Sequence, residues 1–189
     1  MKLFFNASLT GKREYEASCQ AIAEYIQKAG HSVLAPILSK RTIEDVSSES
    51  VNEASTYYRR LRKWIYQSDI CVFEVSYPST GIGHEISLAL NFGKPVIALH
   101  VKKRDPFVLE AMHSENLQVL EYEISEVGRI LDNAIRAASE RMETRFNFFV
   151  PRRLVVYLDW ISKNKRIPRA VYLRQLIRRE MQRNRDFQS

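Results

Sequence analysis

The chain of 189 residues contains only two cysteines, six glycines and six prolines. Cys19 and Cys71 are too few for a disulfide-rich fold or a cysteine-based metal centre, and each lies in an apolar segment, so we expect two reduced core thiols. No apolar run approaches the roughly 18 residues of a membrane span, and the start, MKLFFNASLTGKRE, has too short an apolar core for a signal peptide. The sequence predicts a cytoplasmic protein without a membrane contact, a metal site or a cofactor.

Charge is distributed unevenly along the chain. Residues 1–139 contain 16 basic and 17 acidic residues, whereas residues 140–189 contain 13 basic and 5 acidic residues. Hydrophobic residues make up 45% of the sequence, enough for one full core and a small accessory unit. We therefore predict two domains, residues 1–140 and 141–189, and an anionic partner for the second.

The apolar pattern predicts a regular alternation of strands and helices. Strands are expected at residues 2–6, 32–36, 70–75, 95–101 and 117–122, and helices at 12–29, 49–67, 107–112 and 126–142, with one more helix ending at Gly93. Residues 37–50 lack periodicity and are predicted to be a loop over the site. This alternation implies an α/β fold of the flavodoxin-like three-layer type, with a five-stranded parallel sheet.

The stretch from Ser68 to Pro95 combines the strongest signals. A buried strand ends at Pro78-Ser79-Thr80, two glycines follow, and a helical pattern begins, so Glu85 is predicted in the first turn of that helix. Ligands bind outside the carboxyl ends of parallel strands, and glycines there let the backbone approach a sugar or phosphate. Because glutamate is also common in helix first turns, the spacing alone leaves a purely structural explanation open.

The string DICVFEVSYPSTGIGHEISLALNFGKPVIAL resembles the nucleoside 2-deoxyribosyltransferase family, most closely its deoxynucleoside 5′-monophosphate N-glycosidases, with weaker similarity over residues 1–122. The resemblance implies transfer or hydrolysis at the N-glycosidic bond of a deoxynucleoside or deoxynucleotide. Glu85 takes the place of the nucleophile that attacks the anomeric carbon. The implied substrate-binding residues are Asn6, Ser8, Ser79, Gly81, Gly83 and His84.

The sequence departs from the family pattern at Phe4 and Ala7, where relatives have tyrosine and glycine, and at two positions that bear on the chemistry. Leu61 replaces the aspartate eight residues before Asp69 that orients the nucleophile, and the nearest upstream carboxylate, Glu53, is about two helical turns away. Glu110 replaces a serine that reaches the phosphate of a neighbouring subunit, which makes a 5′-monophosphate substrate less favourable. The alternative function is a catalytically weak sensor of a nucleotide-type ligand.

The basic tail has a pattern of its own. Residues 145–151 alternate like a strand, and two helices are predicted at 152–164 and 168–183. RFNFFVP…RIPRAVYLRQLIRRE resembles the ribbon-helix-helix family, in which two chains pair their strands in the DNA major groove. The resemblance implies a homodimer or larger homo-oligomer that binds duplex DNA. It places Arg145, Asn147 and Phe149 at the bases, and Arg166 and Arg169 at phosphates. A ribbon used only for dimerisation and a helical pair packed on the main domain remain alternatives.

Overall fold

The computed structural model describes residues 1–140 and 149–184. The chain divides into two compact units, residues 1–143 and 144–189, which we treat separately.

The first unit is built on five parallel strands. They are β1 (Lys2–Ala7), β2 (Ser32–Leu34), β3 (Ile70–Glu74), β4 (Val96–Val101) and β5 (Leu117–Tyr122). Their order in the sheet is β2-β1-β3-β4-β5, and all four neighbouring pairs are parallel. The predicted flavodoxin-like α/β architecture with a five-stranded parallel sheet is confirmed.

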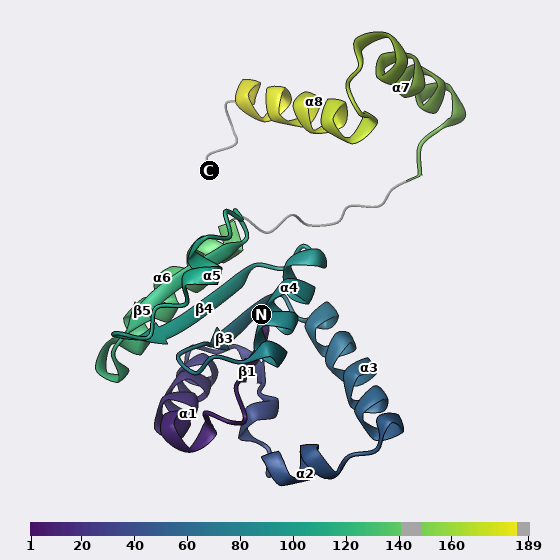
Figure 1. Cartoon of the computed structure of the whole chain (residues 1–189). Helices are drawn as coiled ribbons and strands as arrows, with labels where there is room; N and C mark the ends of the chain where they lie inside the picture. Colours follow the sequence, from purple (N-terminus) through teal and green to yellow (C-terminus); the bar gives the residue numbers. More distant parts are fainter. Residues whose placement is uncertain (141–148, 185–189) are drawn as a thin grey trace. The chain divides into compact units, whose positions relative to one another are not determined.

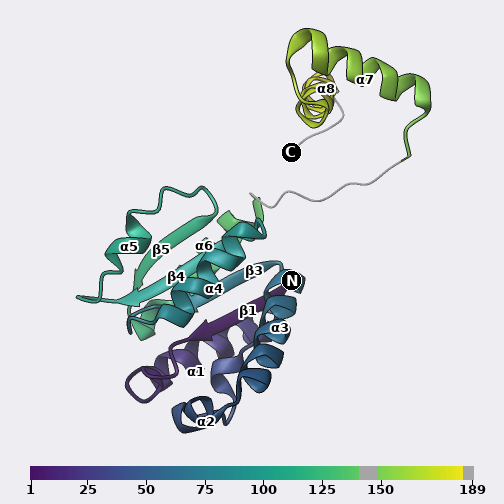
Figure 2. The same ribbon diagram turned by 45° about the vertical axis from the view of Figure 1, so that its right-hand side comes forward.

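Helices cover both faces of this sheet (Figures 1 and 2). Alternate strand residues face opposite layers: Leu3, Phe5 and Ala7 lie in one core with α1 (Lys12–Lys28) and α6 (Val127–Glu140). Phe4 lies in the other core with α3 (Val51–Gln67) and α4 (Thr80–Asn91). Strands buried on both faces give the continuous apolar runs seen in the sequence.

The two cysteines follow the same division. Cys19 belongs to the core beside α1 and α6, and Cys71 belongs to the core beside α3 and α4. Both are free and buried, and burial raises the pKa of each thiol to about 12. The prediction of reduced core thiols is confirmed.

The segment predicted as a loop, residues 37–50, is partly helical. It contains a 3₁₀ turn, η1 (Pro36–Leu38), and a short helix, α2 (Ile43–Ser48). Thr42 and Asp45 form a reciprocal capping box at the start of α2, and Ser50 and Glu53 form another at the start of α3. The loop prediction was wrong because it weighed apolar periodicity and overlooked these two capping signals.

Two short elements, α5 (Phe107–Glu110) and η2 (Ile124–Glu126), complete the first unit. Gly30 and Gly93 follow the ends of α1 and α4 in left-handed conformations, with φ values of 81° and 68°. Such backbone angles favour glycine because it has no Cβ. Among the described residues, no helix is long and apolar enough to cross a membrane.

The second unit contains two described helices, α7 (Arg152–Lys165) and α8 (Arg169–Arg183). Arg145 and Asn147 lie outside the described residues, so the predicted strand is not tested over most of its length, and Phe149 and Val150 are not in a strand. Arg169 was predicted to contact a DNA phosphate, and in the structure its guanidinium forms an ion pair with Asp159. Arg166 is exposed and adopts a left-handed conformation with φ 54°. The ribbon-helix-helix resemblance gains no support, and DNA binding by this unit stays a prediction.

Candidate active site

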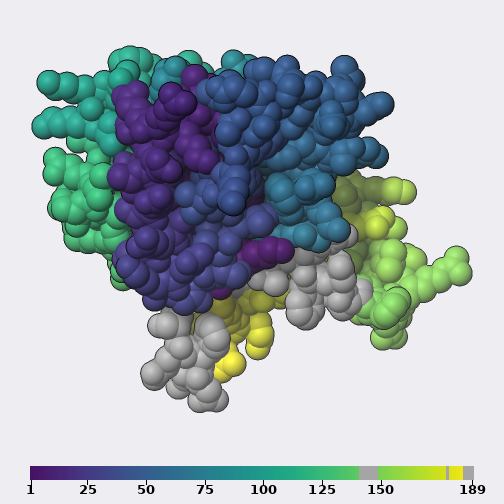
Figure 3. All heavy atoms as spheres, turned by 90° about the horizontal axis from the view of Figure 1, so that it is seen from below, coloured from purple at the N-terminus to yellow at the C-terminus, as the bar shows by residue number. Residues whose placement is uncertain are grey.

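A cleft of about 410 Å³ opens at the carboxyl ends of β1 and β3. Its walls come from the β1–α1 loop, the segment from η1 to α3, and the first two turns of α4. In the space-filling view the N-terminal part of the chain (purple) borders the α2–α3 segment (blue) (Figure 3). The lining residues that matter below are Asn6, Ser8, Arg41, Glu49, Tyr57, Tyr58, Leu61, Ser79, Gly81, His84 and Glu85.

Glu85 is the buried carboxylate of this cleft. It lies in the second turn of α4, not in the first turn as predicted, because the helix begins at Thr80 and includes both glycines. Only 7% of Glu85 is exposed, yet it lines the cleft. Asn6 is 6% exposed, and its Nδ2 atom donates to Glu85 Oε1 at 3.1 Å and to Oε2 at 2.8 Å. The amide at the end of β1 thus fixes the orientation of the carboxylate.

The environment of Glu85 shifts its titration. Burial raises the pKa of Glu85 to about 7, and the hydrogen bond from Asn6 opposes this rise. Desolvation disfavours the charged form of a carboxyl group, whereas a donor to its oxygens favours it. Near neutral pH the group is therefore divided between its two protonation states, a condition typical of residues in active sites.

Two loops hold the entrance of α4 in place. Ser79 caps the helix, since its Oγ accepts a hydrogen bond from the Ile82 N–H at 3.4 Å. Gly11 lies so close to Tyr77 that a Cβ at position 11 would be 2.4 Å from the Tyr77 Cβ. The β1–α1 loop and the β3–α4 loop are therefore in direct contact, and this contact requires a glycine at position 11.

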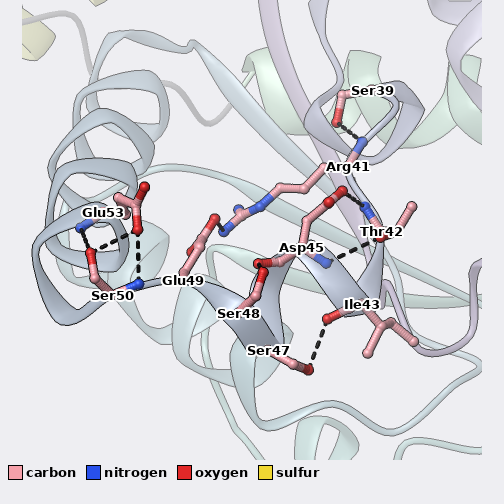
Figure 4. Close-up of polar contacts among 10 residues, drawn as sticks. All are labelled: Ser39, Arg41, Thr42, Ile43, Asp45, Ser47, Ser48, Glu49, Ser50 and Glu53. Atoms are coloured by element: carbon pink, nitrogen blue, oxygen red, sulfur yellow. Dashed lines mark hydrogen bonds and ion pairs between the residues drawn. The ribbon is translucent and has the colours of Figure 1, made fainter.

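A polar wall that the sequence did not reveal comes from the α2 region. Arg41 donates to Glu49 Oε1 at 2.5 Å, and its guanidinium carbon lies 3.7 Å from the centroid of the Tyr57 ring. Figure 4 shows the Arg41 side chain reaching toward Glu49 between the two capping boxes. Burial, followed by the charge of Glu85, raises the pKa of Tyr57. Tyr57 and Glu85 thus interact electrostatically within one cleft.

A second polar pair lies at the rim. The Tyr58 hydroxyl and His84 Nε2 are 2.9 Å apart, and the two ring centroids are 5.6 Å apart. Tyr58 comes from α3 and His84 from α4, so this contact joins the two helices beside Glu85. Both side chains are exposed to solvent and both line the cleft.

The structure locates the positions that depart from the family pattern. Leu61 is 4% exposed and lines the cleft with an apolar side chain. Glu53 is engaged in the Ser50 capping box, and Glu49, four residues earlier, reaches the cleft instead. Glu53 was predicted to lie too far from position 61, about two helical turns away, and Glu49 was not predicted to reach the cleft. A second carboxylate is thus present, but it is paired with Arg41.

Of the residues predicted for catalysis and substrate binding, Gly83 is the one that does not line this cleft. Gly83 borders a second cavity of about 530 Å³, together with Tyr77, Ile86, Lys103 and Phe107. Among the described residues, no atom from outside its own helix lies within 4 Å of the place that a Cβ at position 83 would take. Asn6, Ser8, Ser79, Gly81, His84 and Glu85 share the first cleft.

One group of side chains in the described part of the chain has metal-binding composition. His100, Asp105 and Glu110 place one ligand atom each within 4.8 Å of one another. His100 Nδ1 lies 3.2 Å from the Val101 carbonyl oxygen, and both carboxylates are exposed. None of these three residues lines the cleft that contains Glu85.

The sequence profile of the nucleoside 2-deoxyribosyltransferase family matches residues 3–139. The chain belongs to this family. The match covers every strand and helix that forms the cleft, and it stops before the basic tail. The resemblance that the sequence showed around Glu85 is thereby confirmed for the main domain.

Several members of the family are similar along most of their length. The 5-hydroxymethyl-dUMP N-hydrolase of Rattus norvegicus is 29% identical over 140 residues, which cover 71% of this chain and 85% of the rat protein. The protein of the same name from Esox lucius is 27% identical over 145 residues, covering 74% of this chain and 99% of the fish protein. The 2-deoxyribosyltransferase of Bacillus psychrosaccharolyticus shares the fold, with a TM-score of 0.51, 16% identity, and coverage of 68% and 90% of the two chains.

Proposed function

We propose that this protein cleaves the N-glycosidic bond of a 2′-deoxynucleoside or 2′-deoxynucleotide, or transfers the deoxyribosyl group to another base, with Glu85 as the nucleophile. The observation that carries the proposal is the buried Glu85 carboxylate, held by Asn6 through both oxygens and facing a cleft of about 410 Å³. Family membership supports the same reaction class. Two of the relatives named above are hydrolases of a deoxynucleoside monophosphate, which supports a deoxyribose substrate.

The chemistry requires an ionised carboxylate next to an electron-poor anomeric carbon. Glu85 attacks this carbon, the base departs with the bonding electrons, and a glycosyl ester forms on the enzyme. Water or a second base then takes the sugar from Glu85. Because its pKa is about 7, Glu85 ionises near neutral pH, and the positive charge that develops on the sugar would favour that form.

The charges of the cleft favour a nucleoside over a 5′-monophosphate. Arg41 is the one lysine or arginine among the described lining residues, and it is paired with Glu49. A phosphate would have to compete with that carboxylate for the guanidinium. A phosphate could also bind the free backbone N–H groups at the N-terminus of α4, but one of them, the Ile82 N–H, already donates to Ser79 Oγ. We therefore place uncharged 2′-deoxynucleosides first among the substrates.

The test is incubation of the purified protein with each 2′-deoxynucleoside and each 5′-monophosphate, with and without a free acceptor base, followed by chromatography. We expect release or exchange of base, a preference for nucleosides, and loss of the reaction in Glu85→Ala. Ser87→Ala, on the exposed side of the same helix, is the matched control. Absence of any product and of any thermal shift with every panel member would overturn the proposal.

A further inference from the structure

The cleft contains a polar pair that the proposed reaction has not yet used. Tyr58 and His84 lie 2.9 Å apart, hydroxyl to Nε2, at the rim of the cleft that contains Glu85. Breaking an N-glycosidic bond sends an electron pair to the base, and protonation of the base at that moment lowers the barrier. A group that supplies this proton must come within hydrogen-bond reach of the base.

Position 61, where the family carries a carboxylate, offers no proton. Leu61 is apolar and buried, so it can neither donate to the base nor orient the nucleophile. Tyr58 precedes Leu61 by three residues on α3, and residues three apart on a helix are neighbours on its surface. The hydroxyl of Tyr58 is therefore offered to the cleft from the same helix face that position 61 occupies.

Three other polar side chains of the cleft already have partners. Asn6 donates through Nδ2 to both oxygens of Glu85. Arg41 is held between Glu49 and the Tyr57 ring. The Ser79 hydroxyl oxygen accepts from the helix that it caps. Tyr58 and His84 contact each other and open to solvent, so they can gain and release protons.

We propose that Tyr58 is the acid that protonates the departing base and that His84 supplies the proton to Tyr58. This inference rests on the proposed function. As the C1′–N bond breaks and the bond from C1′ to Glu85 forms, the Tyr58 O–H proton passes to the base nitrogen. The Tyr58 oxygen takes a proton from the His84 imidazolium at Nε2, which leaves a neutral imidazole and a neutral base. In the second step the relay runs in reverse and removes a proton from the attacking water.

In this assignment Tyr58 is a catalytic residue and His84 is a positioning and proton-supplying residue. Because His84 directly precedes Glu85 on α4, one helix positions both the nucleophile and the residue that supplies the proton. Because the second step returns a proton to His84, each turnover leaves both residues in their starting state.

The experiment compares two leaving groups in each variant. One substrate is 2′-deoxyguanosine or 2′-deoxycytidine, whichever the wild-type protein cleaves, and the other is its 7-methyl or 3-methyl form, whose base departs uncharged without a proton. Tyr58→Phe and His84→Asn should lower kcat on the natural nucleoside by about 10² to 10⁴, the range typical of general acid catalysis. On the methylated substrate the same variants should stay within about fivefold of wild type.

Control variants and other outcomes separate this relay from the proposed function. Tyr66→Phe and His113→Asn make the same substitutions at exposed positions that do not line the cleft, and they should leave both rates unchanged. Equal losses on both substrates would assign Tyr58 and His84 a structural role and overturn the relay, as would full activity on the natural nucleoside. Glu85→Ala should abolish both reactions. If the wild-type protein releases base from no 2′-deoxynucleoside and no 5′-monophosphate, the proposed function fails and the relay fails with it.

Discussion

The buried carboxylate of Glu85 should make the protein less stable as the pH rises through neutrality. In the folded state burial raises the pKa of Glu85 from 4.5 to about 7, so the folded chain holds this proton more tightly than the unfolded chain. The stabilising contribution is complete below pH 4.5 and is lost as the pH rises through about 7. Linkage between these two values gives a loss of about 2–3 kcal/mol in the free energy of unfolding between pH 5 and pH 8.

The substitution Glu85→Gln isolates this effect. Glutamine has nearly the shape of a protonated glutamate and cannot ionise, so the variant should resemble wild type at pH 5 and exceed it in stability at pH 8. A change of 1 kcal/mol moves Tm by roughly 2–4 °C in a chain of this size, which predicts a gain of about 5–10 °C at pH 8.

The assay is thermal unfolding of both proteins, followed by circular dichroism at pH 5 and at pH 8 in buffers of equal ionic strength. Glu16→Gln removes an exposed carboxylate on α1 and serves as the control for the change in net charge. The reasoning is refuted if the difference in Tm between wild type and Glu85→Gln is the same at both pH values. It is also refuted if the variant is less stable than wild type at pH 8.

Two further predictions concern the loops around the site. Asn6→Ala removes the donor to both oxygens of Glu85, so the pKa of Glu85 should rise and kcat/KM at pH 7 should fall about 10- to 100-fold, because a hydrogen bond to a charged group contributes about 1.5–3 kcal/mol. A pH–rate profile that keeps its midpoint would contradict this role. Gly11→Ala would place a Cβ 2.4 Å from the Tyr77 Cβ and should cost about 1–3 kcal/mol in urea unfolding. Gly128→Ala meets the ring of a tyrosine side chain that can move, and it should cost less; equal costs would refute the argument.

The sequence predicted the sheet well because the strands are buried on both faces. All five strands were placed within two residues of their observed bounds, and the parallel arrangement followed from the helices between them. The position of Glu85 at the mouth of the sheet followed from the same order of elements. These features follow from the apolar pattern within each element and from the order of the elements along the chain.

The α2 wall of the cleft was not predicted, because its signals are short and polar. Arg41 and Glu49 come from a segment without apolar periodicity, and only the two capping boxes marked it as helical. The contact between Tyr58 and His84 joins residues 26 apart in sequence, and no pattern within either helix predicts it. This pair forms because α3 packs against α4, and the sequence alone does not predict that packing.

The substitution at position 61 and the burial of Glu85 have a common physical consequence. An aspartate at position 61 would add a further carboxylate to a cleft that already contains Glu85 and Glu49, which would raise the pKa of Glu85 further or require a nearby cation. Leu61 removes that repulsion, although it also removes a group that could activate the base. Asn6 then holds Glu85 as an uncharged hydrogen-bond donor. The proton for the departing base must come from groups that do not repel the charge of Glu85. Tyr58 and His84 satisfy this condition, because neither side chain is a carboxylate and both open to water. In the proposed mechanism, leucine at position 61 therefore changes where the proton comes from, and it leaves the attack by Glu85 unchanged.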